Sequence, residues 1–508
     1  MAASRRPPLF PAIPAIFGMA GRFLFLPPPS PPARNSAVPP LPPPDTTDTL
    51  DATFARLRAA AQADPFPDIA TRRGWLTALA DGLAKRQDEI VAAIDADFGG
   101  RLAHETLFAE IFVTIAALRH AKKHLKGWMK RRRRSVPLTL QPGSAWIEPQ
   151  PLGVVGVIAP WNYPLQLALC PLASILAAGN RVLLKPSELT PRTTALIADL
   201  LAQALPGTVA ACVSGGPELG MRFAGLPLDH LLFTGSTRVG RMVMQAAAAN
   251  LTPVTLELGG KSPALLLPDA DVASAAADIA YGKLTNAGQT CVAPDYVLLP
   301  RPALEPFLTA IQQSAATYFP ARNGASAMSV IFGARGRERA QTLLAEARSR
   351  GLRVEPLCAP PPGSDLVPSA IIDPPADIAL MREELFAPLL PIIPYDDLET
   401  ALAQINGRDR PLALYLFGRD GGVIDRVLAR THAGGVSIND TLIHVAVDDL
   451  PFGGVGPSGM GRYHGRDGFD NFSHLKPVFR RGGPRTDRLI RPPLNGLHRK
   501  LLRLLIGR

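Results

Sequence analysis

Apolar residues follow two different periods along the chain. Between residues 50 and 133 they recur at helical spacing, as in Leu76, Leu79 and Leu83, which predicts long amphipathic helices. From 153 to 256, short runs rich in valine, isoleucine and leucine alternate with helical segments. Such alternation is typical of βαβ units, so this region predicts a parallel sheet. Sheets of this kind bind ligands at the carboxyl ends of their strands.

A second region of the same kind extends from residue 263 to about 435 and predicts a second α/β domain. Helical segments separate its short apolar runs, as they do in the first region. The expected strands are 264–267, 296–299, 390–394 and 413–417.

Two short alternating segments, 136–140 and 145–149, precede the first strand of the predicted sheet. Pro142 and Gly143 lie between them, and this dipeptide is a common turn signal. We therefore expect a β-hairpin over 136–150. Projecting hairpins often mediate contacts between subunits, so this one is a candidate oligomerisation element.

The two ends of the chain differ in composition from its centre. Residues 1–47 are rich in proline and cannot form a packed core, so we expect them to be disordered. The arm at 481–508 is basic and amphipathic, with runs such as Leu501-Leu502-Arg503. It suits either a partner subunit or peripheral contact with an anionic membrane surface, and we favour the partner subunit.

Charge and cysteine content exclude several classes of protein. The net charge of +11 is concentrated at 131–134 and in the C-terminal arm, and no base-reading module accompanies it, so we expect no nucleic-acid partner. The four cysteines form no CxxC pair, which argues against a disulfide framework and a metal site and favours the cytoplasm. No apolar run approaches the roughly 20 residues that a membrane-spanning helix needs.

One cysteine, Cys291, ends the polar run Asn286-Ala287-Gly288-Gln289-Thr290-Cys291. A thiol reacts as the thiolate, so a catalytic cysteine needs a base and donors for the anion that it generates. The Asn162 amide, in a proline-bounded loop, is either an oxyanion donor or a turn residue. Glu257 lies among apolar residues and is either a general base or an acceptor that holds a loop.

Two predicted strand ends carry candidate phosphate and ribose ligands. Gly235, Ser236 and Gly240 lie where a strand meets a helix, and free N–H groups at a helix N-terminus attract a phosphate. Lys185 and Glu188 follow another strand and could bind ribose hydroxyls. An ordinary strand-to-helix turn and a surface charge pair explain the same residues, and the patterns alone leave both interpretations open.

Taken in order, these motifs resemble those of the NAD(P)-dependent aldehyde dehydrogenase superfamily. The resemblance covers residues 50–478, nearly the whole chain outside its two arms. The matching segments are Trp161-Asn162, Lys185-Pro186-Ser187-Glu188, Gly235-Ser236-Thr237, Glu257-Leu258-Gly259-Gly260-Lys261, Gln289-Thr290-Cys291, Glu384-Leu385-Phe386-Ala387-Pro388 and Pro451-Phe452-Gly453-Gly454.

The resemblance implies a role for each catalytic candidate. Cys291 attacks an aldehyde, and the Asn162 amide and the backbone N–H of Cys291 hold the oxyanion of the thiohemiacetal. Hydride transfer to the nicotinamide leaves a thioester. Glu257 activates the water that hydrolyses this thioester, so the product is a carboxylic acid.

The resemblance also implies a dinucleotide cofactor, NAD or NADP. The charge of Glu188 would repel the 2′-phosphate of NADP, so NAD is favoured, although Lys185 offsets part of that charge. The residues expected at the cofactor are Trp161, Lys185, Glu188, Gly235, Ser236, Gly240, Glu384 and Phe386.

The implied architecture is the α/β fold of this family. It places a parallel-sheet NAD-binding domain at 48–256, a catalytic domain at 257–445 and a segment at 446–480 that returns to the cofactor domain with an oligomerisation strand. A homodimer is expected.

Within the superfamily, Cys291-Val292-Ala293-Pro294-Asp295-Tyr296 is similar to the class 3 branch, which acts on fatty and aromatic aldehydes. The run at 447–452 and the basic arm resemble the coniferyl aldehyde enzymes of that branch. Two alternatives remain at this point. Enzymes that transfer the acyl group to coenzyme A lack the glutamate base, so Glu257 argues against that reaction. A catalytically inactive scaffold is disfavoured because Cys291, Asn162 and Glu257 are all present.

Overall fold

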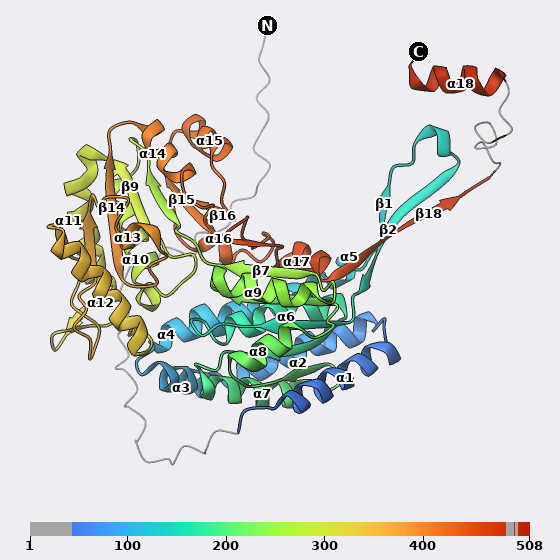
Figure 1. The fold of residues 1–508 in the computed structure, drawn as a ribbon, viewed down its shortest axis with the longest axis horizontal. Coiled ribbons are helices and arrows are strands. Elements are labelled where there is room, and N and C mark those ends of the chain that lie inside the picture. Colours follow the sequence, from blue (N-terminus) through green and yellow to red (C-terminus); the bar gives the residue numbers. More distant parts are fainter. Residues whose placement is uncertain (1–42, 484–491, 493–495, 508) are drawn as a thin grey trace, which may run out of the picture. The chain divides into compact units, whose positions relative to one another are not determined.

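The structure, a computed structural model, describes residues 43–483, 492 and 496–507 (Figure 1). The first 42 residues of the predicted disordered segment 1–47 therefore lie outside the described residues. Its last residues are ordered, because the Asp45 carboxylate accepts from the backbone N–H of Ser214 at 2.7 Å and the first helix begins at Thr47. The predicted boundary at residue 47 is thus a few residues too late.

Helices form the N-terminal part, as the apolar spacing predicted. Side chains accept hydrogen bonds at two helix starts, Thr46 from the N–H of Thr49 and Asp68 from the N–H of Thr71. The helices are α1 Thr47–Ala63, α2 Ile69–Lys85, α3 Gln87–Phe98, α4 Ala103–Glu105, the π-helix η1 Thr106–Phe112 and α5 Val113–Trp128.

The first sheet has six strands in the order β17-β7-β6-β3-β4-β5, all parallel except β17. Its strands are β3 Val154–Ile158, β4 Arg181–Lys185, β5 Ala210–Cys212, β6 His230–Gly235, β7 Val254–Leu258 and β17 Gly459–Met460. The helices between them are α6 Gln166–Ala178, α7 Pro191–Ala204, α8 Pro217–Ala224 and α9 Thr237–Ala248.

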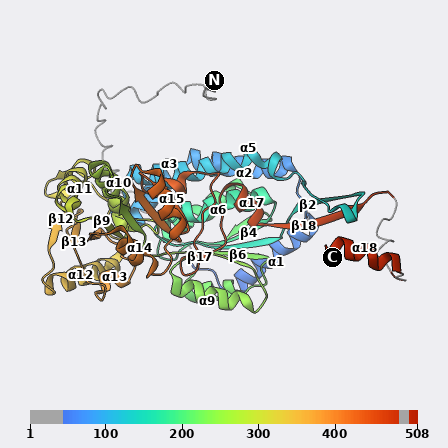
Figure 2. The same cartoon turned by 90° about the horizontal axis from the view of Figure 1, so that it is seen from above.

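Helices cover both faces of this sheet. Val155 and Val157 of β3 belong to one buried cluster, which includes α5 and α6, whereas Val154 and Ile158 belong to a second cluster with α1, α8 and α9. This division follows from the two-residue side-chain period of a strand. Figure 2 shows α5 and α9 on opposite sides of the strands.

The second sheet has seven strands in the order β12-β13-β14-β9-β8-β15-β16, parallel except for β12. The strands are β8 Pro263–Leu266, β9 Tyr296–Pro300, β12 Val354–Pro356, β13 Ser369–Ile372, β14 Leu389–Tyr395, β15 Ala413–Phe417 and β16 Gly435–Ile438. The helices are α10 Val272–Leu284, α11 Leu304–Tyr318, α12 Gly333–Ser349, α13 Ala379–Arg382, α14 Leu398–Asn406 and α15 Gly421–Arg430.

The predicted domain boundary between 256 and 257 needs a correction. It divides β7, which continues to Leu258 and pairs with β6 along its whole length. Glu257 is therefore part of the first sheet, because a strand does not end within its hydrogen-bonded ladder. The return at 446–480 agrees with the structure at one point, since Gly459 of β17 pairs with Glu257.

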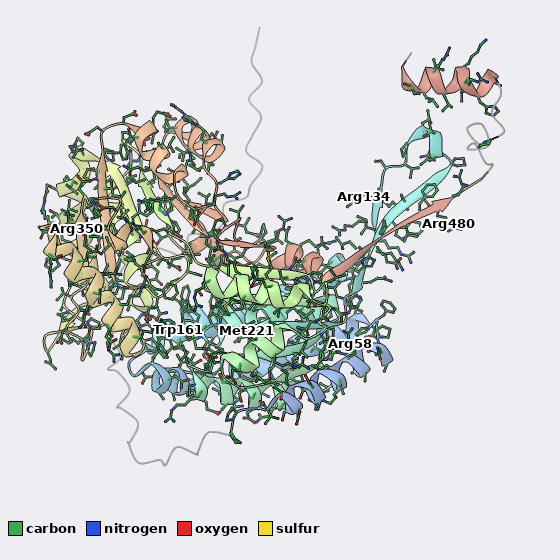
Figure 3. All side chains as sticks on the ribbon, viewed as in Figure 1. Arg58, Arg134, Trp161, Met221, Arg350 and Arg480 are labelled. Atoms are coloured by element: carbon green, nitrogen blue, oxygen red, sulfur yellow. The ribbon has the colours of Figure 1, made fainter. Side chains whose placement is uncertain are left out.

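A third, antiparallel sheet contains the predicted hairpin, but its first strand was misplaced. Strand β1 is Arg132–Arg134, β2 is Gly143–Pro151 and β18 is Ser473–Arg481. The segment 136–140 contains a 3-10 turn instead, because Pro137 has no N–H to donate to a ladder. Figure 3 labels Arg134 on β1 and Arg480 on β18.

Shorter elements complete the described chain. They are β10 Ala321–Arg322, β11 Ala325–Ser326, the 3-10 turns η2 Leu138–Leu140, η3 Thr285–Gly288 and η4 Arg301–Ala303, and the helices α16 Ile443–Ala446, α17 Gly465–Asn471 and α18 Gly496–Ile506. Within the described ranges, no helix is both long enough and apolar enough to cross a membrane.

Candidate active site

The predicted site residues meet at the carboxyl ends of the first sheet. Lys185 of β4 pairs with Ile158 of β3, and Glu257 of β7 pairs with Thr234 of β6, so the loops after these strands emerge at one edge. The loop after β3 carries Asn162. This is the edge at which a parallel sheet binds ligands.

Cys291 follows α10 through a backbone in an uncommon conformation. Asn286, Ala287 and Gly288 have φ values of 52°, 53° and 75°, all in the left-handed region. Only glycine fits at position 288, because a Cβ there would lie 2.5 Å from the carbonyl oxygen of Ala387. Three consecutive left-handed residues turn the chain sharply and bring Cys291 to the start of the next loop.

The environment of Cys291 disfavours its thiolate. Burial raises the pKa of this thiol to about 12, and the nearby carboxylates of Glu384 and Glu257 add to the shift, although the backbone N–H groups of Cys291 and Val292 oppose it. The thiol is therefore neutral near pH 7 in the ligand-free protein. It needs a base to become a nucleophile.

Glu257 is the buried carboxyl that the sequence predicted as that base, and this role stays a prediction. Its side chain is buried, and neither carboxylate oxygen has a hydrogen-bond partner among the described residues. Burial raises the pKa of this carboxyl well above its usual value. A carboxyl held without partners beside a thiol is unfavourable for stability, and such unpaired groups are typical of functional sites.

Asn162 lies directly against the nucleophile loop. Its Nδ2 donates to the carbonyl oxygen of Gln289 at 3.1 Å, and the side chain is buried. An amide nitrogen carries two hydrogens, so one remains available to an oxyanion. The structure thus brings Asn162 to the segment that ends at Cys291, and its function as an oxyanion donor stays a prediction.

Two of the aromatic candidates also meet. The ring centroids of Trp161 and Phe386 lie 5.9 Å apart in an edge arrangement, and Trp161 stacks on Phe332 at 4.7 Å. Phe386 has a φ of 49°, which turns the chain after Glu384 toward this cluster. Trp161 lies in the loop after β3 of the first sheet and Phe386 in the loop before β14 of the second, so the pair connects the two parts of the site.

Glu384 lies in a space that a glycine leaves open. A Cβ at position 259 would come within 2.0 Å of Glu384 Oε2, so only glycine permits this position. Burial, and then the charge of Asp295, raises the pKa of Glu384 to about 8. A cavity of about 360 Å³ adjoins this carboxyl and is lined in part by Thr237, Gly260 and Lys261.

The remaining predicted residues lie at the end of β4 or in the segments that follow β4 and β6. Lys185 Nζ lies 3.1 Å from Glu188 Oε2, so the two form an ion pair. Ser236 caps α9 through a bond from the N–H of Val239. Gly240 lies in α9 where a Cβ would come within 2.6 Å of Leu258, which gives this glycine a function in helix packing. Its contact with a cofactor stays a prediction.

Sequence reasoning missed a charged cluster next to the Glu384 loop. Asp295 lies 2.8 Å from Lys261 Nζ and 3.5 Å from Lys283 Nζ, and its carboxylate accepts from the N–H of Leu385 at 3.2 Å. This cluster fixes the backbone beside Glu384. The available signal was Lys283, the one charged residue on the buried face of α10.

The residues at this edge fit a dinucleotide. The free N–H groups at the start of α9 suit a phosphate, and Glu384 Oε1 is a buried acceptor without a partner among the described residues. In the described part of the chain, no group of three or more His, Cys, Asp or Glu side chains could hold a metal ion.

Comparisons with known proteins agree with this geometry. The profile described as "Aldehyde dehydrogenase family" matches residues 43–478. A probable coniferyl aldehyde dehydrogenase of Pseudomonas aeruginosa is 50% identical over 459 residues, covering 90% of this chain and 96% of that protein. A coniferyl aldehyde dehydrogenase of a Pseudomonas species is 44% identical, covering 78% of this chain and 83% of that protein.

Solved structures of the family share the fold. The substrate-bound state of Staphylococcus aureus AldH has a TM-score of 0.84 and 36% identity, covering 90% of this chain and 99% of that one. The NAD⁺ complex of an aldehyde dehydrogenase from Bacillus cereus has a TM-score of 0.77 and 28% identity, covering 86% of this chain and 89% of that one. Because the family profile spans most of the chain and relatives that are 44–50% identical align with more than three quarters of it, the chain belongs to the aldehyde dehydrogenase family.

Proposed function

We propose that the protein oxidises an aromatic aldehyde of the coniferyl type to its carboxylic acid, with NAD as cofactor. The observation that carries the proposal is the grouping of the Cys291 thiol with the partner-free carboxyl of Glu257 and the amide of Asn162. A nucleophile, a base and an oxyanion donor are the groups that acyl chemistry on an aldehyde needs.

Each of these groups has one task in the reaction. Glu257 takes the thiol proton, and Cys291 Sγ forms a bond to the aldehyde carbon. The second N–H of the Asn162 amide and the backbone N–H of Cys291 donate to the oxygen that becomes negative. Bound NAD⁺ supplies the hydride acceptor. Glu257 releases the first proton to solvent and then removes a proton from the water that cleaves the thioester. When the departing thiolate takes this proton back, the thiol is restored and the acid is free.

We assign the cofactor to the edge that contains the ion pair and the start of α9. Lys185 and Glu188 hold the adenosine ribose, Gly235 and Ser236 the pyrophosphate, and Glu384 with Phe386 the nicotinamide side. Trp161 and Gly240 complete the predicted set. The free carboxylate oxygen of Glu188 opposes a 2′-phosphate, so NAD is favoured over NADP.

The substrate assignment is tested by comparing aldehydes on the purified protein. We expect the highest kcat/KM with hydroxylated cinnamaldehydes such as coniferyl aldehyde, lower values with medium-chain aliphatic aldehydes, and more activity with NAD than with NADP. Absorbance at the NADH maximum measures each rate. A clear preference for long aliphatic aldehydes would overturn the aromatic substrate and leave the reaction class in place.

We also propose a cytoplasmic homodimer, joined through the sheet of β1, β2 and β18, with the C-terminal arm against the partner subunit. Leu504 and Leu505 of α18 are exposed in the single chain, with exposed fractions of 76% and 53%, and are therefore available to a partner. The arm's basic residues make an anionic membrane surface the competing occupant.

Changing both leucines to glutamine separates these occupants. We expect dimers of the double variant to dissociate at a higher protein concentration than wild-type dimers, because apolar contact with the partner is lost. The molar mass from light scattering at a series of dilutions measures this difference. Sedimentation with vesicles that contain anionic lipid should be unchanged. A dimer of unaltered stability together with weaker vesicle binding would favour the membrane instead.

A further inference from the structure

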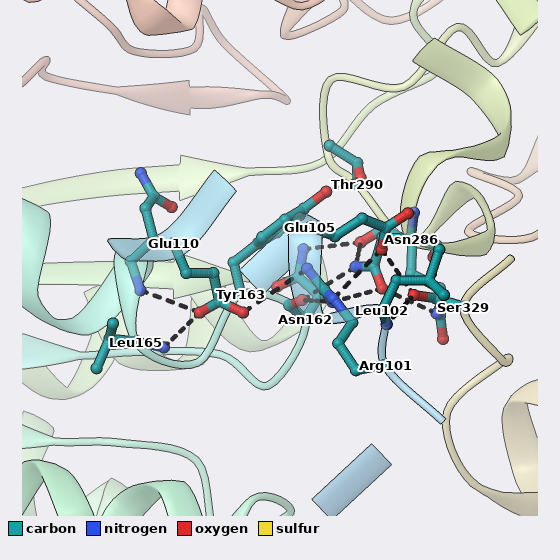
Figure 4. A network of polar contacts seen from close by, with 12 residues as sticks. Arg101, Leu102, Glu105, Glu110, Asn162, Tyr163, Leu165, Asn286, Thr290 and Ser329 are labelled. Atoms are coloured by element: carbon teal, nitrogen blue, oxygen red, sulfur yellow. Dashed lines mark hydrogen bonds and ion pairs between the residues drawn. The ribbon is translucent and has the colours of Figure 1, made fainter. Parts of the chain in front are cut away.

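Arg101 joins two parts of the site that lie far apart in the sequence (Figure 4). Its side chain is fully buried between α3 and α4. Nη1 donates to the carbonyl oxygen of Asn162 at 3.1 Å and to Oδ1 of Asn286 at 2.5 Å. One nitrogen therefore contacts both the oxyanion loop and the start of the nucleophile loop.

Asn286 completes the link between these loops. Its Nδ2 donates to the carbonyl oxygen of Asn162 at 3.0 Å and to that of Gln289 at 3.1 Å. The same Gln289 oxygen accepts from Asn162 Nδ2. The result is a closed set of hydrogen bonds, so a shift of Asn286 would move Asn162 and the residues before Cys291 together.

The guanidinium itself has little freedom to move. Its Nε lies 3.4 Å from Glu105 Oε2, and its Nη2 lies 3.6 Å from Glu110 Oε1. The guanidinium carbon Cζ lies 5.0 Å from the ring centroid of Phe98 and 4.8 Å from that of Tyr163. Two carboxyls and two rings thus fix the direction of the fork. Nε faces Glu105 and Nη2 faces Glu110, while Nη1 contacts both oxygen acceptors. A planar guanidinium can serve these three directions at once, which a single lysine ammonium does less well.

The conformation that Arg101 contacts is one that the chain does not adopt readily. Asn286 and Ala287 are both left-handed, a conformation in which the Cβ of a residue such as alanine crowds the following carbonyl oxygen. Such conformations persist only where surrounding contacts fix them. Glu105 adds a further contact, since it accepts from the N–H of Asn286 at 3.1 Å.

We propose that Arg101 is a positioning residue for the reaction at Cys291. It acts through Asn286 to hold the left-handed turn and through the carbonyl of Asn162 to hold the oxyanion donor, and it touches neither substrate nor cofactor. This inference rests on the proposed function. It concerns addition to the carbonyl group, so binding of NAD is independent of it.

Arg101→Lys tests the inference, because it keeps a buried cation beside the two glutamates and removes the fork. We expect kcat for the aldehyde to fall by about 10²-fold, as a misplacement near 1 Å typically does, while KM for NAD stays within about twofold. Alkylation of Cys291 by iodoacetamide needs an accessible thiol and no oxyanion donor, so its rate should change by less than about threefold.

Arg72→Lys is the matched control. Arg72 is also buried and donates to the carbonyl oxygens of Pro67, Ala177 and Ala178, away from Cys291. It should lower the melting temperature while kcat stays near the wild-type value. The inference would be overturned if both variants lost kcat equally. It would also be overturned if Arg101→Lys lost kcat and the rate of alkylation in parallel, because either result shows a role in folding alone.

Asn286→Ala provides a second route if Arg101→Lys does not fold. It removes the acceptor of Arg101 and should lower kcat by a similar factor, with the same sparing of KM for NAD. An unchanged kcat would overturn the inference. A wild-type protein that oxidises no aldehyde would overturn the proposed function, whereas an active wild type with an equally active Asn286→Ala would overturn this inference only.

Discussion

Protein carrying Cys291→Ala should reduce no NAD when an aldehyde is added. The thiol forms the bond that makes hydride removal possible, so its loss leaves no covalent route to the acid. We expect kcat to fall by on the order of 10⁴-fold or more, the scale seen when a nucleophile is removed from an enzyme. The rate of NADH formation measures the loss, and the melting temperature should stay near that of the wild type.

Cys358→Ala is the matched control for this change. Cys358 is likewise partly exposed, and burial raises the pKa of its thiol to about 11, but it lies beside Ser326 and not beside a carboxylate. This variant should keep wild-type activity. If Cys291→Ala retained aldehyde oxidation, the nucleophile would have been assigned wrongly, whatever the behaviour of Cys358.

Local pattern was sufficient to predict the elements that carry the site. β15 begins and ends at the predicted residues, and the ends of β8, β9 and β14 differ from the prediction by one residue at most, because each is a buried apolar segment with a clear change of pattern at both ends. The resemblance of the motifs to the aldehyde dehydrogenase superfamily then implied that Asn162, Glu257 and Cys291 act together. The structure places Asn162 on the Cys291 loop, and the charge of Glu257 contributes to the pKa of the thiol.

Contacts between distant segments could not be predicted in this way. Arg101 and Asn286 are 185 positions apart, and no local period connects a helical segment with a later loop. Similarly, Asp295 was part of a recognised motif, but its contacts with Lys261 and Lys283 depend on how β9 packs beside α10. In the hairpin, alternation in 136–140 was misleading because Pro137 interrupts the ladder.

The two raised pKa values at the site set its pH dependence. Glu257 can act as a base, towards the Cys291 thiol or towards the water that cleaves the thioester, only when its carboxyl is ionised. Burial raises the pKa of Glu257, so its ionised fraction increases as pH rises through that raised value and decreases as pH falls through it. We therefore expect kcat to increase with pH on a limb displaced above the usual range of a glutamate.

Glu257→Gln should remove that limb and slow the release of the acid. Glutamine has a similar size but cannot take a proton, so hydrolysis of the thioester loses its base, a loss worth about 10²–10⁴-fold in rate. A first turnover of NADH should appear before the slow steady state. Intact-mass measurement should then find the acyl group on Cys291, because the thioester forms faster than it is cleaved.

Hydroxylamine distinguishes a lost base from a distorted site. It is a stronger nucleophile than water, so it attacks the thioester without help from Glu257, and one equivalent of hydroxamate leaves as the thiol is restored. Added hydroxylamine should therefore raise turnover in Glu257→Gln much more than in the wild type. A variant that shows neither a first turnover of NADH nor acyl-enzyme would place Glu257 in activation of the thiol alone, since the slow step would then precede the thioester.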